Sequence, residues 1–345
     1  MAVRLGKQTI AVTSRISISA TASIVGTKES HGPLSPYFDV HMNDAEWKED
    51  TWEKTETKMQ REAAKLAIRK SGLSSDHIHC AFAGDLLNQC ISSGFSAREL
   101  EIPYYGLYGA CSTMIEGLSL SAVTIDGGGA DNTIAVASSH FCTAERQYRN
   151  PLEYGGQRPP TAQWTVTGAG AAVVSKNGGA PYITHVTTGK VVDYGVTDQN
   201  NMGGAMAPAA IDTLITHFKD TGRSPKSYDL ILTGDLGKVG RDIVIDMMGK
   251  GGYDLSANYG DTGCLIYDFE KQDVHSGGSG CGCVAVTLCG YVYEMMKRGK
   301  LNEVLILGTG ALLSPTATLQ GESVPGIAHA IALSNTPGGG KNGVY

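Results

Sequence analysis

The fold of this 345-residue chain is constrained most by an internal repeat, because a strand and the turn that follows it occur twice. A short apolar stretch, 78–83, runs into Gly84-Asp85-Leu86, and a second, 230–233, runs into Gly234-Asp235-Leu236. The two turns lie 150 positions apart. Two copies of one supersecondary unit predict two halves that pack together, since each half alone would leave a sheet face uncovered.

A second matched pair of segments lies 170 positions apart. Cys111 overlies Cys281 at the start of a predicted helix, and Gly129 overlies Gly299 where that helix ends before a strand. The two offsets differ by 20 residues, so the second half is predicted to carry an extra loop around 253–280.

Strand, helix and strand repeated in this order predict an α/β fold with buried, largely parallel strands. We expect an N-terminal half, 1–210, which includes a long irregular region, and a C-terminal half, 211–345. The polar segment 146–165 is predicted to be a loop that is longer than a plain connection needs. Such loops commonly carry function or dimer contacts.

Composition excludes several classes of protein. The 45 glycines have no three-residue period, which excludes collagen, and a net charge of −6 without a basic run argues against nucleic acid as a partner. No stretch of 18 apolar residues predicts a membrane span, and the start, 1–26, is typical of a strand and not of a signal peptide. The eight cysteines form no CxxC pair, so we expect reduced thiols and no resident metal.

Cys111 is the candidate nucleophile, because it lies between small residues and an amphipathic helix. A thiol at a helix N-terminus is expected to have a lowered pKa, and free N–H groups there bind carboxylates equally well. The alternative is that Cys111 is a small core residue at the start of a helix. Cys281, at the equivalent point of the second half, is predicted to serve close packing.

The segment 109–112 and the glycine-rich break 127–129 resemble the thiolase and ketoacyl synthase superfamily over nearly the whole chain. The resemblance implies a five-layered α/β/α/β/α fold built from two duplicated halves, a homodimer, and Cys111 in the place of the acyl-accepting cysteine. The segment 274–280 is similar to the one that supplies a histidine beside that cysteine, which would be His275, and the segment 336–340 is similar to the glycine-rich C-terminal loop.

Two departures from that superfamily stand out. Condensing members carry a second histidine after the strand of the second half, where this chain has 233–237 (TGDLG). Thiolases carry a proton-transferring cysteine before the C-terminal glycines, where this chain has 334–337 (SNTP). Condensation needs a general acid and base, so the resemblance indicates a pocket that is used for binding and not for catalysis.

A closer resemblance is to the stage V sporulation protein AD family. It rests on segments in the same order and spacing: 84–89 (GDLLNQ), 108–113 (YGACST), 138–140 (SSH), 143–149 (TAERQYR), 153–157 (EYGGQ), 206–208 (MAP) and 309–315 (TGALLSP). The resemblance implies a role in the spore membrane machinery that moves dipicolinic acid, pyridine-2,6-dicarboxylate, into the forespore and out at germination. It implies no cofactor; calcium would enter only as the chelate of the ligand.

Dipicolinate is flat, aromatic and doubly anionic, so its site needs an apolar slot and donors for two carboxylates. The predicted ligand-binding residues are Cys111, Ser112, His140, Glu145, Arg146, Arg149, Asn88, Gln89 and His275. Other roles are open for several of them: surface or dimer salt bridges for Arg146 and Arg149, a helix cap for Asn88 and Gln89, and a loop position for His275.

Three functions follow from these patterns. The first is a non-catalytic dipicolinate-binding subunit, peripheral on the spore inner membrane, which works with the other stage V sporulation A-operon membrane proteins. The second is a residual cysteine-dependent acyltransferase that uses Cys111 and His275. The third is a structural plug with a vestigial pocket.

Overall fold

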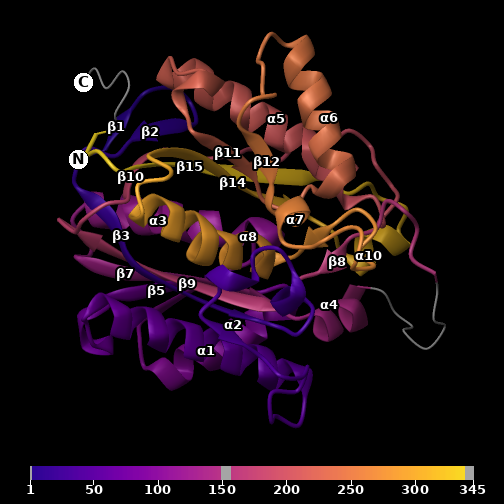
Figure 1. The fold of residues 1–345 in the computed structure, drawn as a ribbon, viewed down its shortest axis with the longest axis horizontal. Coiled ribbons are helices and arrows are strands. Elements are labelled where there is room, and N and C mark those ends of the chain that lie inside the picture. Colours follow the sequence, from indigo (N-terminus) through magenta and orange to yellow (C-terminus); the bar gives the residue numbers. More distant parts are fainter. Residues whose placement is uncertain (1, 149–156, 339–345) are drawn as a thin grey trace.

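The computed structural model describes residues 2–148 and 157–338. Its elements stack in five layers, α/β/α/β/α, which confirms the predicted architecture (Figure 1). One sheet lies between an outer helical layer and a central helical layer, and a second sheet lies between the central layer and the other outer layer. Each half of the chain therefore supplies one sheet, one outer layer and part of the centre.

The first half forms a sheet in the order β3-β9-β7-β5-β6. Its strands are β3 (Ile16–Val25), β5 (Cys80–Gly84), β6 (Tyr104–Leu107), β7 (Asn132–Ser139) and β9 (Gly168–Lys176). Three helices flank them: α1 (Trp52–Ser71) and α2 (Ile91–Leu100) outside, and α3 (Thr113–Asp126) in the central layer. The short strand β4 (Val40–His41) pairs with β3, whereas β1 (Val3–Arg4) pairs with β2 (Thr9–Ala11), and β2 pairs with a strand of the second sheet.

The second half repeats this plan in the order β10-β15-β14-β11-β12. Its strands are β10 (Tyr182–Thr187), β11 (Leu230–Thr233), β12 (Tyr259–Asp261), β14 (Glu303–Ala311) and β15 (Gly326–Ser334). Its outer helices are α5 (Met202–Thr221) and α6 (Gly237–Lys250), and its central helix is α8 (Cys281–Thr287), which a π turn continues into α9 (Tyr293–Lys297). A pairing of Tyr182 with Ser17 joins the two sheets.

The remaining elements gather at one end of the layers (Figure 1). They are α4 (Phe141–Tyr148), β8 (Trp164–Thr165), α7 (Thr262–Leu265), β13 (Gly278–Ser279) and α10 (Pro315–Leu319). The segment 146–165 is thus not a plain loop, because its start belongs to α4 and its end is a strand that pairs with β13. The extra residues predicted around 253–280 include α7 and β13.

The predicted repeat is visible in the helix ends. Helices α1 and α5 each contain 20 residues, and each ends at a glycine with a left-handed backbone, Gly72 at φ 75° and Gly222 at φ 65°. Only glycine adopts that conformation without steric cost. Ser74 and Ser224 then cap matching 3₁₀ turns before β5 and β11. Residue 210, where we expected the halves to meet, lies inside α5, and the repeated order of elements divides between β9 and β10.

The prediction of largely parallel strands is wrong for the centre of each sheet. Strand β9 pairs antiparallel with both β3 and β7, and β15 pairs antiparallel with both β14 and β10. A parallel pair needs a crossover helix that covers a sheet face. Helices α4 and α10, which precede β9 and β15 along the chain, lie at the end of the layers instead, so these strands return antiparallel.

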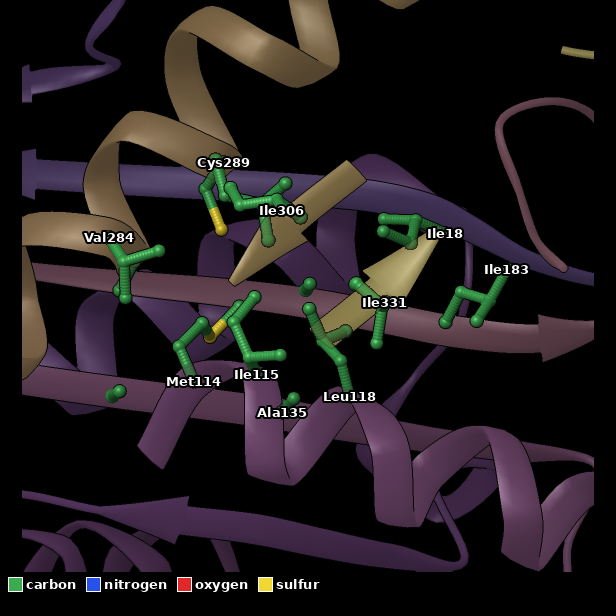
Figure 2. Close-up of a cluster of buried hydrophobic side chains, with 14 of the residues drawn as sticks. Ile18, Met114, Ile115, Leu118, Ala135, Ile183, Val284, Cys289, Ile306 and Ile331 are labelled. Atoms are coloured by element: carbon green, nitrogen blue, oxygen red, sulfur yellow. The ribbon is translucent and has the colours of Figure 1, made fainter. Parts of the chain in front are cut away.

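The central layer provides the main core. Met114, Ile115 and Leu118 of α3 point toward Ile306 and Ile331 of the second sheet (Figure 2). All five side chains are fully buried. This packing fixes the N-terminus of α3, and therefore Cys111, between the two sheets. Within residues 2–148 and 157–338, no helix has both the length and the apolar character to cross a membrane.

Candidate functional site

A cavity of about 1250 Å³ lies at the end of the layers where β7 and β14 finish. Both halves of the chain line it. Its wall includes residues of α4, of the turn before α3, of the start of α5 and of the segment around α10. Its lining residues are Leu86, Tyr108, Ala110, Cys111, Phe141, Ala144, Glu145, Gln147, Tyr148, Gln157, Arg158, Pro159, Thr165, Gln199, Asn200, Met202, Ser279, Ala311, Leu312, Leu313, Ser314, Pro315, Thr318 and Leu319.

Cys111 reaches this cavity from the 3₁₀ turn Ala110–Ser112 that leads into α3. Strand β14 passes close behind the turn, and it can do so because it carries glycine there. A Cβ atom on Gly310 would lie 2.6 Å from the Gly109 carbonyl oxygen, and one on Gly308 would lie 2.8 Å from the Ser112 carbonyl oxygen. Neither separation is possible for a real Cβ, so these two glycines set the depth at which Cys111 lies.

The expected thiolate is not found, because the pKa of Cys111 is raised well above its ordinary value. Burial of the thiol is the main cause, and the negative charge of Asp235 is the second. A hydrogen bond from the Gly280 N–H acts in the opposite direction but does not offset them. The helix N-terminus is therefore a weaker influence on this thiol than burial beside an acid, and Cys111 is a neutral thiol at pH 7.

Asp235 occupies the segment where the condensing enzymes were expected to carry a second histidine. It follows β11 and is fully buried. One carboxylate oxygen accepts from Thr309 Oγ1 at 2.8 Å, the other accepts from the Gly280 N–H at 2.9 Å, and the Cys111 thiol lies beside the group. Burial raises the pKa of Asp235 to about 6, so at neutral pH it is an anion next to the thiol.

Cys281 packs as predicted. Its side chain is fully buried, and its thiol donates to the Ala110 carbonyl oxygen at 2.9 Å, on the turn that holds Cys111. Burial raises the pKa of this thiol well above its ordinary value. Cys281 thereby joins the two repeated helices at their N-termini.

Three other predicted site residues, Glu145, Ser112 and His140, have different surroundings. Glu145 lines the cavity and is buried. Ser112 is buried, and its hydroxyl donates back to the Gly109 carbonyl oxygen at 2.6 Å, away from the lining. His140 is also buried: Nδ1 accepts from the Cys142 N–H at 3.2 Å, so Nε2 donates to the Ala45 carbonyl oxygen at 2.9 Å. Burial lowers the pKa of His140, which therefore supports α4 as a neutral ring.

Arg146, the one described residue of the two predicted arginines, is not among the residues that line the cavity. Arg146 lies in helix α4 and not in a loop, and it forms an ion pair with Glu53 of α1. Its guanidinium also lies 5.4 Å from the ring centroid of Trp52. This arginine therefore fastens α4 to the N-terminus of α1. Arg149 lies outside the described residues.

Three further predicted site residues, Asn88, Gln89 and His275, also have structural roles. The backbone N–H of Asn88 donates to Gln147 Oε1 at 3.0 Å, and Gln89 has φ 60° in the turn before α2. His275 has Nδ1 2.8 Å from the Pro159 carbonyl oxygen and Nε2 3.0 Å from an Asp273 carboxylate oxygen. None of the three is among the residues that line the cavity.

The sequence does not reveal a set of hydrogen bonds on the cavity wall that joins α4 to the turn after β5. Gln147 Nε2 donates to the Leu86 carbonyl oxygen at 3.0 Å, and the Tyr148 hydroxyl donates to the same oxygen at 2.6 Å. The Tyr108 hydroxyl lies 3.1 Å from that of Tyr148. These contacts hold α4 against the turn after β5. The sequence of 143–149 predicts a role for Glu145, Arg146 and Arg149 only, because a charged side chain is easier to recognise in a sequence than a hydrogen-bond network between distant segments.

A second buried acid lies behind α4. Glu56 of α1 accepts from Ser138 Oγ at 2.9 Å and from Thr143 Oγ1 at 2.8 Å. Burial raises its pKa to about 8, and the neighbouring charge of Asp85 acts in the same direction.

We expect the variant Glu56→Gln to be more heat-stable than the wild type at pH 8. Glutamate in an unfolded chain ionises near pH ~4.3, so the folded protein binds the extra proton between that pH and about 8. The free energy of unfolding contributed by Glu56 is therefore full below pH ~4.3 and falls as the pH rises through that window. Glutamine cannot ionise and is expected to gain a few degrees in melting temperature at pH 8. Circular-dichroism melts across the range measure this, and a gap between the two proteins that does not widen with pH would contradict it.

Together, the two duplicated sheets, the central helix with a cysteine at its N-terminus and the cavity beside it define a thiolase-like fold. Solved structures of that class superpose on the chain. A single-substitution variant of OleA from Xanthomonas campestris is 14% identical with a TM-score of 0.61, and the match covers 93% of this chain and 99% of that one. The 3-oxoacyl-[acyl-carrier-protein] synthase III from Aquifex aeolicus VF5 is 14% identical with a TM-score of 0.56, with the same coverage.

The chain belongs to the stage V sporulation protein AD family. The model of that family, described as "Stage V sporulation protein AD (SpoVAD)", matches residues 6–334. The chain is also 44% identical over 333 residues to the Stage V sporulation protein AD of Bacillus subtilis (strain 168), which covers 96% of this chain and 98% of that protein. The resemblance expected from the sequence is thereby confirmed.

Proposed function

We propose that this protein is a non-catalytic subunit that binds dipicolinic acid during its movement into the forespore and out at germination. One observation carries the proposal: the cavity of a condensing-enzyme fold is retained, while its cysteine is a neutral thiol beside the buried carboxylate of Asp235. A nucleophile needs a base that accepts its proton or a charge that stabilises its thiolate. The adjacent anion of Asp235 instead disfavours the thiolate of Cys111.

The cavity wall suits a flat, polar aromatic molecule. Phe141, Tyr108 and Met202 supply apolar surface, and Asn200 and Ser279 supply hydrogen-bond donors. Planar rings bind well against such surfaces, and a few fixed donors orient their substituents. In the described part of the chain, no group of three or more metal-ligating side chains is present, so calcium is proposed only as the chelate of the ligand.

Titration calorimetry of the purified protein with dipicolinate, with and without calcium, tests the proposal. We expect saturable binding with one ligand per chain, and weaker binding by the variant Cys111→Trp, whose side chain enters the cavity. Arg298→Gln, at an exposed position on the far end of α9, is the matched control and should bind as the wild type does. Absence of binding heat in both conditions would overturn the proposal and favour the structural plug.

A residual acyltransferase is the second candidate, because Cys111 does line a cavity large enough for an acyl chain. Such an enzyme would form a thioester on Cys111 when exposed to acyl-CoA. Intact-protein mass spectrometry across several chain lengths decides this question. We expect no adduct, and an adduct that is lost in Cys111→Ala would establish the alternative.

We also propose that the protein works in the spore, peripheral on the inner membrane, with the other stage V sporulation A-operon membrane proteins as partners. Family membership supports the sporulation role. The membrane location and the partner proteins are proposed from the family resemblance alone. Co-purification of the tagged protein with its partners from spore membrane extracts tests both.

A homodimer is proposed through the edge strand β6, the last strand in its sheet. Tyr105 of β6 is 62% exposed, and Ile91, Phe95 and Tyr108 beside it are also exposed. A cluster of exposed apolar side chains along an unpaired edge is typical of a surface that another chain covers.

We expect the double variant Phe95→Asp, Tyr105→Asp to run at the mass of one chain, while the wild type runs at the mass of two. Two carboxylates on this surface would have to be desolvated in the dimer, which is costly. Size-exclusion chromatography with light scattering measures the masses. Ile245→Asp, an exposed apolar position on α6, is the control and should remain dimeric. A wild type that is monomeric at micromolar concentration would contradict the proposal.

A further inference from the structure

Arg158 lies in the segment that precedes β8 and forms part of the cavity wall. Its side chain is only 16% exposed, and its guanidinium lies 4.6 Å from the ring centroid of Trp164. Phe141, also on the cavity wall, is stacked on Trp164 with ring centroids 3.9 Å apart. Arg158 and Phe141 therefore both pack against the ring of Trp164. The guanidinium is thus packed against an aromatic ring and mostly buried before any ligand binds.

A second cation lies on the same ring. Lys28 Nζ is 3.5 Å from the Trp164 centroid and donates to the Asp273 carbonyl oxygen at 2.9 Å. Burial lowers the pKa of Lys28, and the positive charge of Arg158 lowers it further. The nearby acid balances the pair only weakly, because the Asp273 side chain is 74% exposed and lies 3.4 Å from Arg158 Nη2. The buried carboxylate of Glu29 also acts on Lys28, so two cations and two acids lie at this end of the cavity.

One nitrogen of Arg158 lacks a hydrogen-bond partner among the residues that the structure describes. Nη2 donates to the Asp273 carbonyl oxygen at 3.3 Å, whereas Nη1 is enclosed and makes no hydrogen bond within 2–148 and 157–338. A buried charged donor that lacks an acceptor costs free energy, and an anion that binds nearby recovers it. Arginine suits this role better than lysine, because its planar fork matches the two oxygens of a carboxylate.

We propose that Arg158 is the residue that selects a carboxylate-bearing ligand, and that it pairs with one carboxylate of a planar aromatic acid in the cavity. The inference rests on the proposed function and deepens it, because it names the group that distinguishes a dicarboxylate from a neutral molecule of the same shape. Trp164 and Phe141 hold the arginine in position, and Lys28 adds charge without lining the cavity.

The inference is tested by a thermodynamic cycle in which the ligand and the side chain at position 158 are changed separately and together. Dipicolinate and its uncharged isostere pyridine-2,6-dicarboxamide are titrated into the wild type and into Arg158→Gln, with binding measured by calorimetry. Loss of a charge-assisted pair is expected to weaken dipicolinate binding roughly 10- to 100-fold. Binding of the dicarboxamide should change by less than about 3-fold. The ratio of the two affinities, which measures the preference for the dicarboxylate, should therefore fall in the variant by nearly the whole roughly 10- to 100-fold. Arg158→Lys should recover only part of it, because lysine keeps the charge but lacks the fork.

Each outcome bears on one claim. If Arg158→Gln weakens both ligands equally, the arginine has a structural role only, and the inference is overturned. If the wild type binds dipicolinate and the variant binds it equally well, the inference fails while the proposed function stands. If the wild type binds neither ligand, both fail. Melting temperatures of the wild type, Arg158→Gln and the control Arg298→Gln show whether the variants are folded.

Discussion

Replacing Asp235 with asparagine is expected to speed the alkylation of Cys111 at pH 8 by about 10-fold, which corresponds to a fall of about one unit in the pKa of the thiol. The Asp235 carboxylate lies beside that thiol, is ionised at this pH, and its negative charge raises the pKa of the thiol. Asparagine keeps an oxygen that can accept from the Gly280 N–H, and it replaces the charge with an amide donor that stabilises a thiolate. The burial of Cys111 is unchanged, so its pKa falls without reaching that of a catalytic cysteine.

Iodoacetamide labelling followed by peptide mass spectrometry measures the rate at Cys111 alone. Cys142, which is partly exposed, serves as the internal reference and should react at the same rate in both proteins. Asp261→Asn is the matched control: this acid is also buried, its pKa is raised to about 7 by burial, and it hydrogen-bonds to Thr233 Oγ1. Equal rates at Cys111 in the wild type and in folded Asp235→Asn would show that the carboxylate does not control the thiol.

Filling the cavity is expected to abolish ligand binding with little loss of stability. Ala144 lies on α4, is 4% exposed and lines the cavity, so the variant Ala144→Trp places an indole in the space that the ligand would occupy. We expect dipicolinate affinity to fall at least about 50-fold, since a ligand cannot share that volume, and overpacking to cost no more than about 1–3 kcal/mol.

Calorimetric titration measures the affinity, and thermal melts confirm that the variant is folded. Ile245→Trp, an exposed position on α6 outside the cavity, is the control and should bind as the wild type does. Ala311→Phe fills the cavity from the second half of the chain, so it provides an independent variant if Ala144→Trp does not fold. Undiminished binding in either folded variant would place the ligand elsewhere on the molecule.

The architecture could be predicted from the sequence because the repeat includes residues, such as glycine, that particular backbone conformations require. Gly72 and Gly222 each end a long helix in the left-handed conformation, and the strands that follow end in matching Gly-Asp-Leu turns. The strand directions were harder to predict. Strands β9 and β15 are as buried as parallel strands are, so their apolar runs gave no sign of antiparallel pairing, which depends on where α4 and α10 lie.

Of the predicted site residues that the structure describes, Cys111 and Glu145 line the cavity. Cys111 lines the cavity as expected, because helix start, small neighbours and cysteine are local features of the sequence. The pKa of this thiol depends first on its burial and second on the charge of Asp235, which is distant in sequence. Arg146 was chosen for its charge, but its partner Glu53 lies on a different layer, and Arg158 owes its place to Trp164 and Asp273. Such pairings cannot be read from spacing along the chain.

A crystal structure of the protein soaked with dipicolinate tests the central claim most directly. The account predicts density for the ligand in the cavity beside Cys111, with one carboxylate paired to Arg158 and no covalent bond to the Cys111 sulfur. Ligand density bonded to that sulfur, or found only outside the cavity when the cavity itself is open to solvent, would contradict the account of a retained cavity used for non-covalent binding.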